Sequence, residues 1–222
     1  MVLQDFFNYT SGRWIYNEKQ QLEARHIPFS VEGLKKAAAE ALGVPDSFDV
    51  IKVREGLFNR AFLLSNTEGI ELIERLPTSL AGPKRLTTAN EVATLKLMAA
   101  LEIPVPKVFS YSCCAESDVG SGFILMEWAT GVPLLSIWEK MGRKWRGQLL
   151  TQLVEIDCKL LALKLSGYDS IYLKQDLPEC SGIPVSSDPA FSEYSLGPSV
   201  ERSWWTQERK SMSINRGPCN PF

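Results

Sequence analysis

The chain contains a single histidine, His26, among its 222 residues, which excludes a multi-histidine metal site or a histidine relay. Its five cysteines are an odd number at spacings that match neither a metal site nor a secreted disulfide framework, so reduced thiols are expected. No run of about 18 apolar residues occurs, so no transmembrane span is predicted. The formal net charge of −2 and the pI near 5.6 give no electrostatic footprint for binding nucleic acid.

The N-terminus lacks both the charged and apolar segments of a signal peptide and the arginine-rich, acid-poor character of a transit peptide. Hydrophobic residues make up 45% of the chain and charged residues 23%, which is typical of globular proteins. The length fits one or two domains.

A strand, a helix and two further strands are predicted within residues 70–129, and they form the centre of the chain. The first strand, 70–76, stops at Pro77, which cannot donate to a sheet ladder. The helix is expected to begin at Thr88, because Thr88 and Glu91 have the spacing of a capping box. The remaining strands and a connector are predicted at 108–111, 123–126 and 127–131.

This order of elements is typical of a kinase small lobe, in which a strand cation holds the nucleotide phosphates and a helix glutamate orients that cation. Arg75 and Glu91 are the candidates for these two roles. Each also has a simpler explanation: Arg75 as a surface arginine at a strand end, and Glu91 as part of the capping box. Their order within the complete pattern favours the kinase interpretation.

Residues 1–29 are rich in aromatic side chains, which predicts an irregular arm packed on the rest of the lobe. Ser30 is expected to cap a helix over 31–42, and Gly43 is expected to end it.

Two strands, at 48–54 and 60–65, precede the strand of Arg75 and are joined by a turn. A turn in this position can offer backbone amides to phosphate oxygens. It contains only one glycine, Gly56, so an ordinary hairpin loop explains it equally well. Asn59 either contacts a phosphate or supports the turn.

Beyond residue 131 a helix is predicted to begin at 132–138, and a longer amphipathic helix is predicted over 144–165. Its buried face is expected to consist of Leu149, Leu153, Ile156, Leu160 and Leu163. Residues 168–173 form a candidate short strand, and 176–222 have a loop-like composition with six prolines. A structureless run of that length is unusual in a compact domain and suggests a domain cut off before its packing partners.

Several blocks of this sequence, all in register, closely resemble the aminoglycoside-phosphotransferase-like kinase family. The blocks are residues 56–62, 75–78, 81–83, 91–94, 104–108 and 126–134. Residues 7–14, 197–199 and Trp204 also resemble the fungal altered-inheritance-of-mitochondria branch of that family. The resemblance implies ATP with magnesium as cofactors and a mitochondrial location, with the cytoplasm as the alternative because no transit peptide is visible.

The same resemblance implies positions for a nucleotide site. Arg75 stands where the family has its phosphate-holding cation, and Glu91 stands where it has the pairing glutamate. Ile73 would face the base, while Glu127 and Ala129 occupy connector positions whose backbone groups bind adenine. Gly56 and Asn59 of the turn complete the candidate cofactor-binding residues.

The sequence departs from the family at the catalytic centre. Phosphoryl transfer needs an aspartate base and magnesium ligands, which the family supplies from a His-Gly-Asp…Asn stretch and a second aspartate motif. No such stretch occurs here, so no catalytic residue or metal ligand is assigned. The chain is expected to be the truncated N-terminal part of such a kinase.

The expected fold is α+β: a protein kinase-like small lobe with an antiparallel sheet of about five strands plus a helix, followed by the helical start of an incomplete large lobe. The predicted domains are an arm (1–29), the small lobe (30–130) and the start of the large lobe (131–222). The predicted function is weak ATP binding without phosphoryl transfer. The alternative is a non-enzymatic, pseudokinase-like binding or scaffold module that uses the arm and Trp204–Trp205 as contacts.

Overall fold

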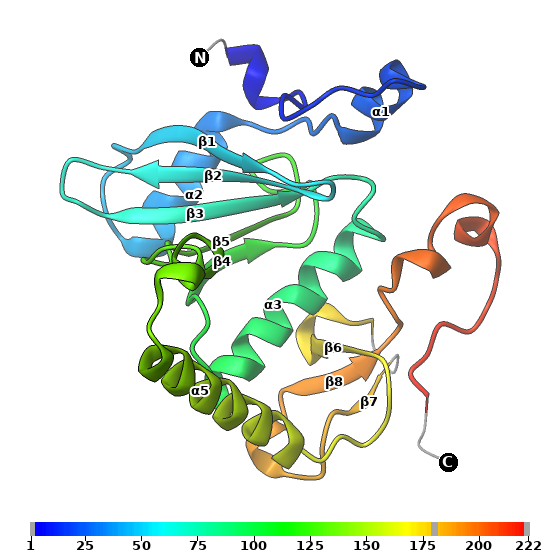
Figure 1. Cartoon of the computed structure of the whole chain (residues 1–222). Coiled ribbons are helices and arrows are strands. Elements are labelled where there is room, and N and C mark those ends of the chain that lie inside the picture. Colours follow the sequence, from blue (N-terminus) through cyan, green and yellow to red (C-terminus); the bar gives the residue numbers. More distant parts are fainter. Residues whose placement is uncertain (1–2, 179–181, 220–222) are drawn as a thin grey trace.

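A five-stranded antiparallel sheet dominates the computed structural model, which describes residues 3–178 and 182–219 (Figure 1). The strands are β1 (Asp49–Glu55), β2 (Asn59–Ser65), β3 (Glu71–Pro77), β4 (Val108–Ser112) and β5 (Phe123–Glu127). They lie in the order β1-β2-β3-β5-β4, and each neighbouring pair is antiparallel. The predicted α+β fold, with an antiparallel sheet of about five strands and a packed helix, is confirmed.

One face of this sheet packs against α2 (Val31–Leu42) and the N-terminal arm. As predicted, the Ser30 side chain caps α2 by accepting the Gly33 N–H at 3.0 Å. Gly43 ends the helix with a φ of 67°, in the left-handed region that favours glycine. The core on this face is formed by the buried apolar residues of the arm, α2 and the strands, including Phe6, Ile27, Leu34, Ala38, Phe62, Leu64, Leu72 and Leu76.

The N-terminal arm docks on the lobe, as predicted. It is not wholly irregular, because it contains the helix α1 (Glu18–Arg25). Arg25 is buried, and its guanidinium lies 4.5 Å from the ring centroid of Trp14 and 5.8 Å from that of Tyr9. This stack joins the loop of Tyr9 and Trp14 to the end of α1.

The helix α3 (Lys84–Ala100) begins four residues earlier than predicted. Pro83 stands at its start, where a residue without an N–H costs no intrahelical hydrogen bond. Thr88 therefore lies inside the helix, and its hydroxyl donates to the Lys84 carbonyl at 3.2 Å. The predicted capping box at Thr88 and Glu91 is wrong, and Glu91 needs another explanation.

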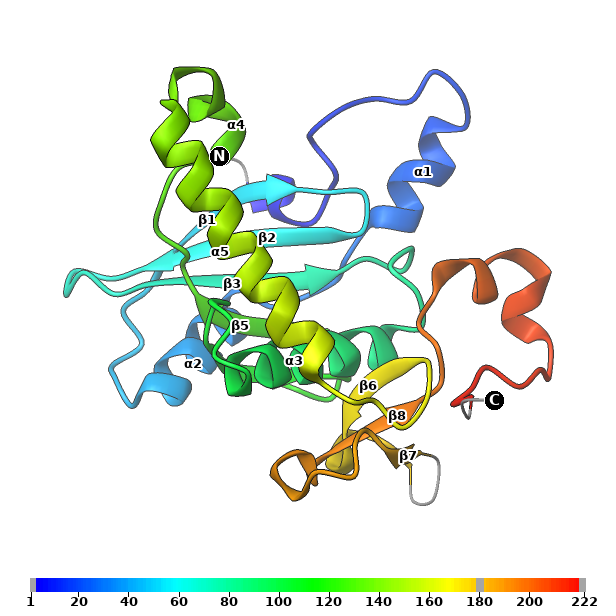
Figure 2. The same ribbon diagram turned by 60° about the horizontal axis from the view of Figure 1, so that its bottom comes forward.

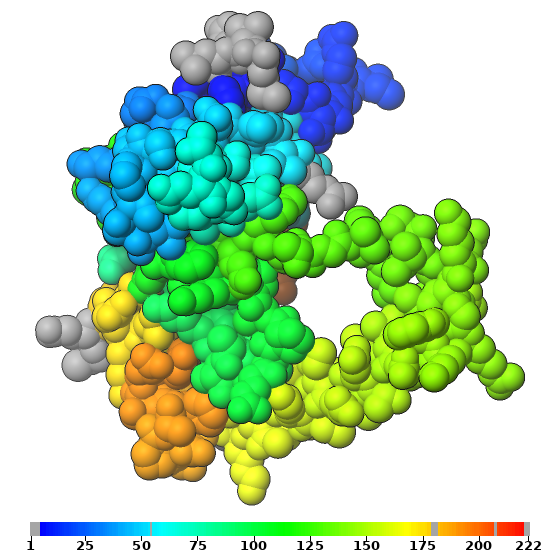
Figure 3. All heavy atoms as spheres, turned by 90° about the vertical axis from the view of Figure 1, so that its left-hand side faces the viewer, coloured from blue at the N-terminus to red at the C-terminus, as the bar shows by residue number. Residues whose placement is uncertain are grey.

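The connector leads into α4 (Leu134–Ile137), a 3₁₀ turn (Trp138–Lys140) and α5 (Arg143–Ala162). No residue of α4 or α5 is buried. The predicted buried face of α5 is therefore wrong; Leu153, for example, is 47% exposed. An amphipathic pattern needs a surface to cover, and Figure 3 shows that the segment of α4 and α5 stands away from the sheet, with an opening between them.

A second, three-stranded sheet follows, made of β6 (Ser170–Leu173), β7 (Ile183–Pro184) and β8 (Tyr194–Gly197) in the order β6-β8-β7. The prediction of loop over 176–222 is wrong here, because strands of two to four residues are too short to show an alternating pattern. Two 3₁₀ turns, Arg202–Trp204 and Gln207–Ser211, come after it.

The helix α3 lies between the two sheets and joins them into one body (Figures 1 and 2). A second core forms around it, from the buried residues Val92, Ala93, Leu97, Ile124, Met126, Leu173, Val185, Tyr194 and Leu196. Within residues 3–178 and 182–219, no helix has both the length and the apolar character needed to cross a membrane.

Candidate functional site

Arg75 on β3 and Glu91 on α3 form a two-point ion pair. The Nη2 group of Arg75 donates to Oε2 of Glu91 at 3.0 Å, and a second contact joins Nη1 to Oε1. Both side chains are partly buried, 35% and 24% exposed respectively. Burial raises the pKa of Glu91 above its ordinary value, and the neighbouring guanidinium partly opposes that rise. The two residues that the element order singled out are thus in direct contact.

Asn59, at the start of β2, joins this pair. In the orientation of the Asn59 side-chain amide that gives both its oxygen and its nitrogen a partner, the oxygen accepts from Arg75 Nη2 at 2.9 Å. The nitrogen then donates to the Phe58 carbonyl at 3.3 Å. Gly56 has a different role, because its N–H donates to the Asn59 carbonyl at 2.8 Å and closes the hairpin. The turn therefore contributes a side chain to the cluster, while the Gly56 amide is used within the turn.

An apolar surface lies on the same face of the sheet as Arg75. The strand register places Ile51, Leu63, Ile73 and Met126 beside one another across four strands, and Ala61 directly opposite Arg75. Ile51 is 49% exposed, and Ile73 is partly buried. The family resemblance points to Ile73 alone. Pairing the alternating strands in register is the signal that identifies its neighbours.

Glu127 and Ala129 lie where β5 leaves the sheet, and both are exposed. The backbone N–H of Glu127 donates to the Lys107 carbonyl at 2.8 Å, and its carboxylate accepts the Lys107 N–H at 3.2 Å. The side chain of Glu127 therefore fixes the connector to the segment before β4, a contact that the sequence did not reveal.

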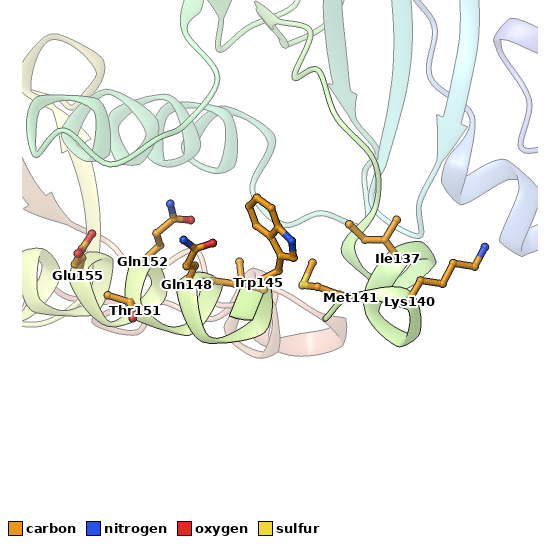
Figure 4. A pocket seen from close by; sticks show the side chains of 9 residues that line it. Ile137, Lys140, Met141, Trp145, Gln148, Thr151, Gln152 and Glu155 are labelled. Atoms are coloured by element: carbon orange, nitrogen blue, oxygen red, sulfur yellow. The ribbon is translucent and has the colours of Figure 1, made fainter. Parts of the chain in front are cut away.

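An open hollow of about 870 Å³ lies on the segment that follows the connector. Its lining comes from α4, the 3₁₀ turn and α5. Figure 4 shows Trp145, Gln148 and Gln152 pointing from α5 toward α3 and the sheet, with Ile137 and Met141 nearby. In Figure 3 the chain that leaves β5 and the segment of α4 and α5 border the opening.

A buried charge network lies beneath the β1–β2 turn, on the opposite face of the sheet. The Glu55 carboxylate accepts from Lys52 Nζ at 2.7 Å, from Arg60 Nε at 2.9 Å and from the Thr10 N–H at 2.6 Å. Burial raises the pKa of Glu55, but Lys52, Thr10 and Arg60 outweigh that effect and leave it below its ordinary value. Lys52 and Arg60 also donate to arm carbonyls, so the network ties the arm to the base of the turn.

The described residues contain no group of three or more histidine, cysteine, aspartate or glutamate side chains that could hold a metal ion. His26 lies in the arm, with Nδ1 3.3 Å from Oδ1 of Asn8. The geometry thus offers a cation, an amide and an apolar surface, which together suit a planar, anionic ligand.

No protein-family model matches the sequence. The chain is 40% identical over 172 residues to a subtelomeric hrmA-associated cluster protein of Aspergillus fumigatus, a match covering 77% of this chain and 33% of that protein. It is 25% identical over 260 residues to altered inheritance of mitochondria protein 9, mitochondrial, of Saccharomyces cerevisiae, covering 90% of this chain and 42% of that protein. The chain is similar to the fungal altered-inheritance-of-mitochondria proteins. This confirms the branch expected from the sequence.

A relative with the same altered-inheritance name in Candida albicans is 25% identical over 248 residues, covering 92% of this chain and 40% of that protein. The chain thus spans a third to about two fifths of the length of these curated relatives. Among solved structures, it is similar to APH(2'')-IIia in its GDP and kanamycin complex. That match has 20% identity and a TM-score of 0.45, and covers 59% of this chain and 42% of that one.

Proposed function

We propose that this chain is the N-terminal part of a kinase-like phosphotransferase, with a nucleotide-binding small lobe at residues 30–130. We propose further that it binds ATP weakly and does not itself transfer phosphate. The observation that carries this proposal is the Arg75–Glu91 ion pair between β3 and α3, with Asn59 attached to it. In kinases, a strand cation paired with a helix glutamate holds the nucleotide phosphates. The resemblance of several sequence blocks to the aminoglycoside-phosphotransferase-like kinase family supports the same assignment.

The residues present fit a nucleotide. Arg75 stays 35% exposed while paired, so phosphate oxygens can reach a guanidinium that matches their geometry. Ile73 and the half-exposed Ile51 offer an apolar surface for the base, and the connector at Glu127 and Ala129 lies where β5 ends. Bound ATP would supply the transferable phosphoryl group, and these residues would hold and orient it.

The absence of transfer follows from what phosphoryl transfer requires. An aspartate must accept the acceptor's proton, and further ligands must hold Mg²⁺. The only histidine of the chain lies in the arm, so no His-Gly-Asp stretch is present, and no acidic group of the described residues forms a metal cluster. The affinity of this chain for ATP should also be weak, because Arg75 and the apolar strand surface contact the nucleotide from one side only.

The test compares ATP-dependent thermal stabilisation in three proteins. The wild type should gain stability as ATP and Mg²⁺ are added. Arg75→Ala should weaken apparent ATP affinity about 10- to 100-fold, since a hydrogen bond to a charged group contributes roughly 1.5–3 kcal/mol. Glu127→Gln keeps an acceptor for the Lys107 N–H and should respond like the wild type.

The shift caused by ATP must be compared, rather than the melting temperature itself, because Arg75→Ala also leaves Glu91 unpaired. A full ATP response in Arg75→Ala together with a lost response in Glu127→Gln would contradict the assignment. The same experiment with magnesium omitted measures how far the nucleotide alone is recognised.

A second candidate, a non-enzymatic binding or scaffold module, is favoured by the exposed helices. Trp145 is 66% and Leu161 is 84% exposed, and large exposed apolar side chains are common at interaction sites. Trp205, one of the contacts expected for such a module, instead donates its Nε1–H to the Ser199 carbonyl at 2.7 Å. Absence of any ATP response, with a defined protein complex that Trp145→Ala abolishes, would favour this candidate.

We also propose a mitochondrial location, supported only by the names of the yeast relatives. Fractionation of source cells, followed by detection of the native protein, distinguishes it from the cytoplasmic alternative.

A further inference from the structure

The helix that carries Glu91 is held from two sides. The five-stranded sheet packs on one side of α3, and the second sheet packs on the other through Leu173, Tyr194 and Leu196. Beside Glu91, Asn90 donates its Nδ2–H to the Ile171 carbonyl of β6 at 3.0 Å. A swing of α3 away from β3 would therefore open a shared apolar core and break this hydrogen bond.

The segment after β8, residues 198–206, which we call the strap, is fixed to the same second sheet. The Tyr172 hydroxyl donates to the Pro198 carbonyl at 2.5 Å, and the Val200 N–H donates to Ser170 Oγ at 3.0 Å. Both partners on the sheet belong to β6, the strand that also contacts Asn90. The strap and α3 are thus anchored to one strand.

The strap reaches the β1–β2 turn through Arg202. Its guanidinium lies 3.7 Å from the ring centroid of Phe58, and its Nε donates to the Leu80 carbonyl at 3.2 Å. The Phe58 carbonyl in turn accepts the Thr78 N–H at 2.7 Å. Phe58 directly precedes Asn59, so Arg202 acts on the turn that carries one member of the polar cluster.

We propose that the second sheet and the strap form a built-in brace, in which Asn90 and Arg202 are positioning residues for the phosphate end of a bound nucleotide. Asn90 holds α3 so that Glu91 keeps its ion pair with Arg75. Arg202 holds the turn so that Asn59 keeps its hydrogen bond to Arg75. This inference rests on the proposed function. A site preset in this way has less conformational freedom to lose when the ligand binds.

The brace makes a specific prediction about ligands. Asn59, Arg75 and Glu91 form the polar end of the site, whereas Ile73 and Ile51 belong to the apolar surface. Loosening α3 or the turn should therefore weaken binding of ATP and leave binding of adenosine unchanged. A merely structural role for Asn90 or Arg202 would lower thermal stability without distinguishing the two ligands.

The experiment measures dissociation constants for ATP and adenosine by calorimetry. Asn90→Ala and Arg202→Ala should each weaken ATP binding about three- to tenfold, the effect of losing one hydrogen bond or one cation–π contact. Arg202→Lys keeps a cation for the Phe58 ring and should retain part of the affinity. Two exposed control changes, Lys84→Ala in α3 and Lys210→Ala after the strap, should leave both ligands unaffected.

Equal losses for ATP and adenosine, or no loss for ATP, would overturn the brace. If the wild type binds neither ligand, the proposed function fails. Hydrogen exchange of the free protein then tests the brace on its own. Arg202→Ala should then speed exchange of the Phe58 and Asn59 amides, and Lys210→Ala should not. Unchanged exchange in Arg202→Ala would overturn the proposal without any nucleotide.

Discussion

The helices α3 and α5 have similar lengths, 17 and 20 residues, and both carry apolar side chains at helical spacing, yet their surroundings differ completely. Five residues of α3 are buried, because a sheet covers each of its two sides. No residue of α5 is buried. A helical apolar pattern thus shows which residues can be covered, and the rest of the chain decides whether they are.

This difference matters because packing supplies most of the stability of a helix in a folded protein. The ion pair that defines the candidate site lies on α3, the helix that the two sheets fix. The open hollow lies on α4 and α5, none of whose residues is buried. The ion pair is therefore built on elements that pack into a core, whereas the hollow is not.

The largest expected effect comes from truncating one leucine in each helix. Leu97 of α3 is fully buried, so Leu97→Ala should reduce the free energy of unfolding by about 2–5 kcal/mol. Leu153 of α5 is 47% exposed, so Leu153→Ala should change it by less than about 0.5 kcal/mol. Urea unfolding measures both, and equal losses would break the contrast between the helices.

A smaller effect should come from Glu74, an unpaired acid within the packed region. Glu74 is fully buried on β3, and neither of its carboxylate oxygens has a hydrogen-bond partner within the described chain. Burial alone raises its pKa well above the ordinary value. Because an unsatisfied buried polar group costs about 1–3 kcal/mol, Glu74→Met should stabilise the protein by that amount at neutral pH.

The raised pKa of Glu74 also makes the free energy of unfolding depend on pH. The folded state keeps the Glu74 proton to higher pH than the unfolded chain, so the unfolded state binds fewer protons between the two pKa values. Stability should fall as pH rises from the unfolded pKa, near 4.3, through the folded one. Glu74→Met should remove that part of the fall, and Glu74→Gln is the control that removes ionisation but keeps a buried polar group.

Sequence reasoning succeeded where the signal was local. The five strands were predicted within about two residues, because alternation and turn residues mark them, and Ser30 and Gly43 mark the ends of α2. The Arg75–Glu91 contact could be anticipated because strand and helix follow one another directly. The sequence also allows a capping box at Thr88 and Glu91, but α3 starts earlier, after Pro83, which rules that explanation out.

Sequence reasoning failed where contacts join distant segments. Thr10 reaches Glu55 across 45 residues, and Arg202 reaches the Leu80 carbonyl across 122 residues. No local pattern reports such pairs. The candidate strand at 168–173 is β6, but β7 and β8 were missed because they are only two and four residues long. Without them, nothing in the sequence pattern indicates that a second sheet covers α3.

The smallest expected effect tests the open side of α5 directly. Leu161 is 84% exposed, so Leu161→Lys should change the free energy of unfolding by no more than about 0.5 kcal/mol while reducing the binding of a hydrophobic dye such as ANS. Burying an unpaired lysine is costly, so a loss well above that limit would mean that α5 is covered in solution. Sedimentation of the wild type would then show whether a second copy covers it, since only that case depends on protein concentration.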